Sequence, residues 1–167
     1  MARYVIVGDR SRIWADAKSS VHPIHVETAG LAGHLEVEVA DGEARLGTPT
    51  RIELEVERLK SGNALIDSDL QRRLEARRFP LIEGELREAT ALTGSRHQLH
   101  GDLTLHGVAR SLQVEVTARP GGDGTVEVEG EKVIDMRDFD LTPPRFLMLK
   151  VEPFVKIRAR LVARRQD

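Results

Sequence analysis

Apolar and charged residues alternate with a period of two along much of this chain. Clear examples are "HLEVEVA" at 34–40 and "RIELEVERL" at 51–59, and the alternation returns at 112–118, 125–131 and 155–161. Successive side chains of a strand point to opposite faces, so each segment predicts a strand with one apolar and one charged face. Such strands favour antiparallel sheets. The predicted inward residues are Leu35, Val37, Val39, Ile52, Leu54, Val56, Leu99, Leu103, Leu105, Leu112, Val114, Val116, Val126, Val128, Val155, Ile157, Ala159 and Leu161.

One segment departs from this alternation. Residues 63–80 read "NALIDSDLQRRLEARRFP" and place Leu70 and Leu74 one helical turn apart. Asp67 or Ser68 is the expected N-cap, and the proline at the end of the segment is the expected stop. The pattern predicts one helix of about three turns, which covers a barrel mouth or a sheet edge.

About eight strands and one helix are consistent with two architectures. A sandwich packs two apolar faces together, whereas a barrel turns one apolar face inward. An eight-stranded barrel is either filled by its own side chains or holds one small ligand. Periodicity alone does not choose between these alternatives.

Composition narrows the class of protein. The 167 residues include 40% hydrophobic but only 4% aromatic residues, so the interior is expected to be mainly aliphatic. The length and the absence of an internal repeat or linker predict one domain over 1–167. The near-neutral net charge of −2 argues against a nucleic-acid partner, and the absence of cysteine excludes disulfides and thiol chemistry. The chain shows no membrane-spanning apolar run and no secretion signal, so a cytoplasmic location is expected, with a secreted or periplasmic one only if a signal was removed.

Four blocks of sequence resemble the YceI-like family. They are "GDLTLHGVARSLQVEV" at 101–116, "DSDLQRRLEARRFPLIEGEL" at 67–86, "MRDFDLTPPRFLMLKVEPFVKIRARLVA" at 136–163 and "SRIWADAKSSVHPIHVETAGLAGHLEVEV" at 11–39. The first block resembles the family's Gly-x-Leu-Thr-hydrophobic-His-Gly-Val signature. The last block departs from the family's pattern, because it has Pro23 and two histidines, His22 and His25, where family members often have one. His25 is the favoured counterpart because of its distance to Gly33.

The resemblance implies an antiparallel, lipocalin-like barrel of about eight strands with one short capping helix. It also implies an apolar tunnel for an amphiphilic isoprenoid lipid, such as a polyprenyl phosphate or a quinone. The expected function is binding or carriage of this lipid without chemistry and without an obligatory cofactor. The candidate ligand-binding residues are Leu54, Val56, Phe79, Leu103, Leu105, Val114, Phe139, Arg145, Phe146, Met148 and Ile157.

Arginines are the candidates for an anionic head group. Arg145 lies beside two prolines, and its planar guanidinium suits a phosphate. Arg77 and Arg78 are rival candidates, although charge at a helix end explains them equally. Trp14, opposite Ile13 along its strand, is expected to lie outside the tunnel.

His106 is expected to be structural. If Leu103 and Leu105 face inward, His106 faces outward, and Gly107 allows a tight turn into the next strand. The imidazole would then bond to backbone groups at this corner, whereas a place at the tunnel mouth is the minority interpretation.

Other functions remain as alternatives. A barrel with a filled interior would act through its surface as a stress-related protein-interaction module. The His-x-x-His spacings "HPIH" and "HQLH" suggest the hypothesis of a histidine-based metalloprotein. On a strand, however, the two histidines of such a pair point to opposite faces. No Gly-x-Ser-x-Gly elbow or phosphate loop supports an enzyme. A homodimer through an exposed strand edge or the capping loop is a further hypothesis about partners.

Overall fold

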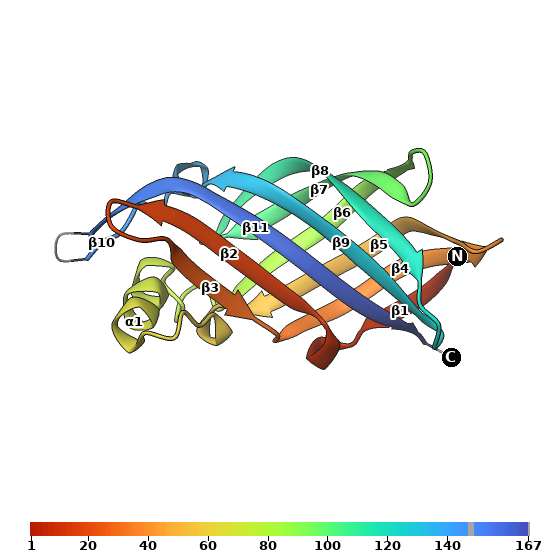
Figure 1. Ribbon diagram of the computed structural model, residues 1–167, viewed down its shortest axis with the longest axis horizontal. Coiled ribbons are helices and arrows are strands. Elements are labelled where there is room, and N and C mark those ends of the chain that lie inside the picture. Colours follow the sequence, from red (N-terminus) through yellow and green to blue (C-terminus); the bar gives the residue numbers. More distant parts are fainter. Residues whose placement is uncertain (147–148, 167) are drawn as a thin grey trace.

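The chain folds into an antiparallel barrel in the computed structural model, which describes residues 1–146 and 149–166 (Figure 1). Its strands are β1 (Ala2–Ile6), β2 (Arg12–Ser19), β3 (Ile24–Thr28), β4 (Leu31–Ala40), β5 (Glu43–Glu55), β6 (Leu81–Ala91), β7 (Arg96–Leu105), β8 (Val108–Pro120), β9 (Thr125–Asp135), β10 (Arg145–Phe146) and β11 (Leu149–Arg165). The helix α1 (Ala64–Arg73) and three 3-10 turns, η1 (Gly8–Arg10), η2 (Val56–Arg58) and η3 (Met136–Phe139), complete the elements.

Closure of the sheet explains why the alternating pattern is so regular. The hydrogen-bonded order β1-β4-β5-β6-β7-β8-β9-β11 returns to β1, which closes eight strands into one barrel. Every pairing is antiparallel, and each strand turns its apolar face inward. The predicted fold class is therefore confirmed.

The first strand of the sequence is interrupted, which raises the number of separate strands above eight. β1 pairs with the end of β11, where Tyr4 lies opposite Arg165. After η1, β2 continues along the same edge of β11, where Ala17 lies opposite Val155. β3 then pairs with β2 as β4 pairs with β1.

The N-cap of α1 lies four residues before Asp67 and five before Ser68, the two predicted caps. The side chain of Asn63, not Asp67 or Ser68, accepts hydrogen bonds from the backbone N–H groups of Leu65 (2.9 Å) and Ile66 (3.3 Å). Asp67 lies inside the helix, where its carboxylate accepts hydrogen bonds from the hydroxyl and the backbone N–H of Ser61 in the preceding loop. The prediction was wrong because several residues in this segment are good caps, and the loop geometry selects one of them.

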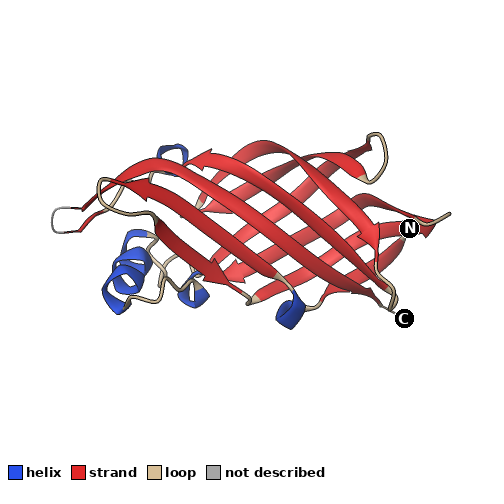
Figure 2. Cartoon of the chain, viewed as in Figure 1, coloured by secondary structure: helices blue, strands red, loops and turns tan. Residues whose placement is uncertain are grey.

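The helix also ends earlier than expected. α1 stops at Arg73, and Glu75 adopts a left-handed backbone with φ 51°, which breaks the helix before Pro80. Arg77 and Arg78 therefore lie beyond the helix and not in its last turn. α1 lies at the barrel end opposite to the two termini (Figures 1 and 2).

Two predicted inward residues differ from expectation. Val39 is 43% exposed, because it lies one residue from the end of β4, where the strand leaves the barrel and enters the β4–β5 hairpin. Val56 is 1% exposed but belongs to η2, because β5 ends at Glu55. Among the described residues, no helix is both long enough and apolar enough to span a membrane.

Candidate functional site

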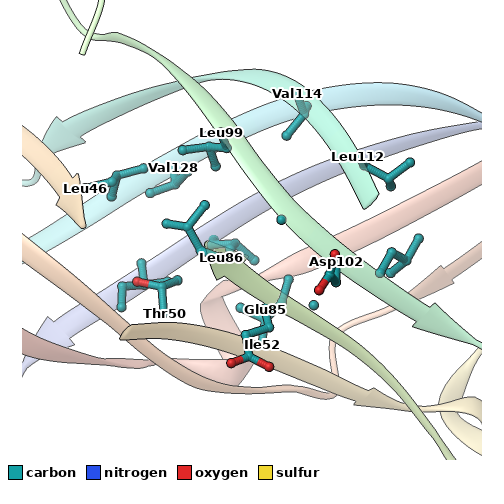
Figure 3. Close-up of a pocket in the computed structure, with 15 residues that line it drawn as sticks. Leu46, Thr50, Ile52, Glu85, Leu86, Leu99, Asp102, Leu112, Val114 and Val128 are labelled. Atoms are coloured by element: carbon teal, nitrogen blue, oxygen red, sulfur yellow. The ribbon is translucent and has the colours of Figure 1, made fainter. Parts of the chain in front are cut away.

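An apolar cavity of about 200 Å³ lies inside the barrel (Figure 3). Seven of the eight strands of the closed ring contribute to its wall, from β4 through β9 to β11. The lining residues are Leu35, Leu46, Thr50, Ile52, Gly84, Glu85, Leu86, Leu99, Gly101, Asp102, Leu103, Leu112, Val114, Val128 and Leu161.

The two sides of the cavity differ in burial. Leu35 on β4 and Leu161 on β11 are only 3% and 7% exposed, as expected for residues of a packed core. Leu99, Leu112 and Val114 on β7 and β8 face the same interior yet are only half-buried. These half-buried side chains are the accessible wall of the cavity.

Two polar side chains of the lining, those of Thr50 and Asp102, form hydrogen bonds within the barrel wall. The Thr50 hydroxyl donates to the Gly47 carbonyl (2.7 Å) and accepts from the Glu36 backbone N–H (3.0 Å) at the irregular register between β4 and β5. The Asp102 carboxylate accepts from Arg87 Nε (2.7 Å) and from the Ser111 hydroxyl (3.0 Å).

Those bonds to Asp102 also set its ionisation. The hydrogen bond from Arg87 and then that from Ser111 hold the pKa of the Asp102 carboxyl below its usual value. The carboxyl therefore stays ionised at neutral pH and remains bound to Arg87. The cavity is thus lined almost entirely by groups that contact a ligand through dispersion and burial.

Glycine creates part of the space. Gly84 on β6 lies opposite Ile52 on β5, and a Cβ at Gly84 would approach Ile52 Cγ1 to 3.1 Å. A larger residue at Gly84 would project into the space that the cavity occupies. A glycine within the apolar alternation of 81–86 was the sequence signal for this space, because strand glycines often mark a close approach.

The predicted ligand-binding residues fall into four groups. Leu103 and Val114 line the cavity, whereas Leu54, Val56, Leu105 and Phe139 belong to the buried core outside it. Ile157 is half-buried on β11, and Phe79 is half-buried after α1. Arg145 and Phe146 form β10, and Met148 lies outside the described residues. The sequence interpretation missed the other lining residues, although its inward set already contained several of them. They are Leu35, Leu46, Thr50, Ile52, Gly84, Glu85, Leu86, Leu99, Gly101, Asp102, Leu112, Val128 and Leu161.

A basic groove lies near β10. Arg145, Lys150 and Arg137 line this groove, which has a volume of about 650 Å³ and also contains Pro143 and Glu152. The Arg137 guanidinium binds the Asp135 carboxylate (2.7 Å) and thereby lowers the pKa of that carboxyl. The groove gives Arg145 basic neighbours, and its role toward an anionic head group stays a prediction.

His106 lies in the β7–β8 hairpin and joins this hairpin to η3 at the end of the barrel. His106 and Gly107 have φ values of 56° and 71° between the paired residues Leu105 and Val108, which is the backbone of a two-residue turn. His106 Nδ1 lies 3.0 Å from the Phe139 carbonyl oxygen. This contact confirms the expected bond to the backbone.

A second contact of His106 was not anticipated. Its Nε2 atom lies 2.6 Å from Glu75 Oε2, just beyond the end of α1, and the Phe79 ring meets the imidazole edge-on at 5.6 Å. His106 therefore joins the hairpin to the segment after the helix. The sequence offered no signal for these partners, because Glu75 is 31 residues away along the chain.

His97 on β7 is 2% exposed and lies in the barrel core, whereas His25 and Trp14 lie on the outside of the barrel. His25 on β3 contacts Asp16 (2.6 Å) and Glu27 (3.2 Å). Trp14 lies under the guanidinium of the exposed Arg158, at 5.1 Å, which places it outside the barrel interior. In the described part of the chain, no group of three or more His, Cys, Asp or Glu side chains could hold a metal ion.

Comparison with known proteins finds several that share this architecture. The family model for the YceI-like domain matches residues 4–163. The solved structure of BcnA from Burkholderia cenocepacia superposes with a TM-score of 0.79 at 17% identity, over 94% of this chain and 98% of that one. A polyisoprenoid-binding domain from Saccharophagus degradans, implicated in plant cell wall breakdown, gives 0.78 at 10% identity, over 99% and 100%.

A third similar structure is the YceI protein from Campylobacter jejuni. It gives a TM-score of 0.69 at 14% identity, over 86% of this chain and 85% of that one. A search of curated proteins found no match. At these identities the solved structures establish the shared fold.

Proposed function

Because this chain belongs to the YceI-like family, we propose that its barrel binds the apolar chain of an amphiphilic isoprenoid lipid, such as a polyprenyl phosphate or a quinone. The observation that carries the proposal is the apolar cavity inside the barrel, with its half-buried wall on β7 and β8. The similarity to a polyisoprenoid-binding domain supports the ligand class. The bound lipid is proposed to undergo no chemical change.

Burial of apolar surface would drive this binding. Each Å² of lipid surface removed from water contributes about 25 cal/mol, and an aliphatic wall supplies this gain without directed polar contacts. The incomplete burial of Leu99, Leu112 and Val114 favours this function over a barrel filled by its own side chains, in which these residues would be buried.

The cavity volume sets a condition on the ligand. At about 200 Å³ the cavity is smaller than typical pockets for drug-sized ligands, which start at about 300 Å³. A long isoprenoid therefore requires rotamer changes in the half-buried leucines, since buried leucines on the opposite side have no space to move. We expect a short chain, such as farnesol, to bind with less rearrangement than a long one.

Mass spectrometry of an organic extract tests the proposal directly. The protein would be purified without detergent, extracted, and then incubated with farnesol and with a long-chain quinone. A near-stoichiometric isoprenoid in the extract, or uptake of either probe, is the expected result. A blank extract together with no uptake of either probe would overturn the proposal.

A matched pair of variants shows whether binding occurs in the cavity. Val114→Phe fills the cavity from β8, whereas Gln113→Phe places the same ring on the exposed outer face of the same strand. We expect Val114→Phe to weaken farnesol binding at least about tenfold while the melting temperature is kept or raised. Gln113→Phe is expected to bind as the wild type does, and equal loss in both variants would contradict a site in the cavity.

A further inference from the structure

The ladder between β8 and β9 is much shorter than the strands themselves. It joins Val116–Pro120 of β8 to Val126–Gly130 of β9 and then stops. Residues 108–115 remain paired with β7, and residues 131–135 remain paired with β11. Within the described chain, no ladder joins these two stretches to each other. We call the two facing edges, residues 108–115 and 131–135, the β8–β9 seam.

The seam is bounded at both ends. The Val116–Gly130 pair closes it toward the chain termini. At the other end, η3 returns from β9 toward the start of β8, where Arg110 Nε donates to the Asp138 carbonyl (2.8 Å). The His106 contact to the Phe139 carbonyl fixes the same turn. The seam is therefore a defined interval in the barrel wall.

Two cations occupy inward positions along the seam. Lys132 on β9 lies opposite Ile157 in an uninterrupted register that also pairs the cavity residues Val128 and Leu161. Because paired residues share a face, Lys132 stands on the inner face of the barrel. By the same rule Arg110 on β8, opposite the cavity residue Leu103, stands on that face too.

These positions break the pattern that builds the barrel. Inward positions elsewhere on β8 and β9 are held by residues such as Leu112 and Ile134, and a charge at such a position needs a function or a route to water. Lys132 and Arg110 are both exposed, so the seam gives them that route. Lys132 has no ion pair or hydrogen bond with any described residue.

The acidic residues of the seam point the other way. Glu131 on the outer face pairs with Lys156 (3.5 Å), and Glu115 pairs with Arg96 (3.8 Å). Asp135 is paired with Arg137 (2.7 Å). The inner side of the seam therefore carries positive charge that these carboxylates do not neutralise by direct contact.

We infer that the β8–β9 seam holds the anionic head group of an amphiphile, with Lys132 and Arg110 as its cations and the apolar chain in the cavity. Arg110 is two residues from Leu112 on the same face of β8, which is about 7 Å along a strand. Head and chain would thus lie beside each other, as they do in an amphiphile. This inference rests on the proposed function and assigns the head group to the seam instead of the groove at Arg145.

Calorimetric titration with two probes of the same chain tests the inference. Farnesyl phosphate carries the anionic head, and farnesol carries a neutral one. Lys132→Met is expected to weaken farnesyl phosphate binding at least about tenfold, because a charge-assisted contact is lost, and to leave farnesol binding within about twofold. Lys18→Met is the matched control, since Lys18 is an exposed lysine on the outer face of β2.

Further variants separate the outcomes. Arg110→Gln should also weaken binding of farnesyl phosphate but not of farnesol, whereas Arg145→Gln should change neither. If instead Arg145→Gln weakens farnesyl phosphate binding and Arg110→Gln does not, the head group lies in the groove near β10. If the wild type binds both probes and Lys132→Met changes neither or both equally, the seam inference is wrong and the proposed function stands. If the wild type binds neither probe, the seam inference fails, and a blank extract without uptake of the long-chain quinone would overturn the proposed function as well.

Discussion

The two sides of the cavity are built from the same residue types but pack differently. On β4, β9 and β11, Leu35, Val128 and Leu161 are 3%, 6% and 7% exposed. On β7 and β8, Leu99 and Leu112 occupy equivalent inward positions and are only half-buried. One side is a core that supports the barrel, and the other is a wall available to a ligand.

The seam extends this difference to the backbone. β9 is paired with β11 over its whole length, from Thr125 to Asp135, on the packed side. Toward the half-buried side it is paired only as far as Gly130. Weak packing and missing ladder pairs thus occur at neighbouring places. Local opening costs least where few buried contacts hold a strand, so this side is the one expected to adapt to a ligand.

Truncation of one leucine on each side should give the largest contrast. Leu161→Ala removes a packed side chain and is expected to lower the free energy of unfolding by about 2–5 kcal/mol. Leu112→Ala removes a side chain that already borders empty space, and we expect a loss of about 1 kcal/mol. Urea denaturation of both variants measures the difference. Equal losses would mean that the two sides are equally packed in solution.

The alternating pattern predicted the fold well because strand periodicity reports which face is apolar. It could not report whether an inward Leu112 meets another side chain or a cavity, because this depends on how the strands are staggered around the barrel. The pattern of 125–135 did contain a signal that was overlooked, since Lys132 stands where the alternation requires an apolar residue. The Asn63 cap and the contact of His106 with Glu75 depend on loop geometry that no local pattern encodes.

Variants of His106 should have an intermediate effect and test how the seam is held at its η3 end. His106→Asn keeps a residue that tolerates the left-handed turn but loses both contacts, at an expected cost of about 1–2 kcal/mol. His106→Ala should cost about 1 kcal/mol more, because alanine is disfavoured at φ 56°. Hydrogen exchange of residues 108–115 should accelerate in both variants, more than that of β4.

If His106 only shapes the turn, the stabilities of the two variants would differ from these expectations. His106→Asn would then match the wild type in urea denaturation, and only His106→Ala would be destabilised. That result would show that the contacts of His106 with Phe139 and Glu75 do not stabilise the η3 end of the seam.

The smallest effect is expected at His25, and it separates outer-face electrostatics from interior packing. Hydrogen bonds to Asp16 and then to Glu27 raise the pKa of His25 above its ordinary value near 6.5. The folded state therefore favours the protonated imidazole. The resulting stabilisation is fully present below the unfolded-state pKa and is lost as the pH rises through the raised pKa of the folded state.

Because the His25 side chain is 44% exposed, solvent screening limits this stabilisation to a few tenths of a kcal/mol. The melting temperatures of the wild type and of His25→Gln should therefore differ more at about pH 5.5 than at about pH 8.5, with the wild type higher. A difference independent of pH would show that His25 acts through packing. The contrast between Leu161→Ala and Leu112→Ala should remain the same at both pH values, since neither side of the cavity contacts this outer cluster.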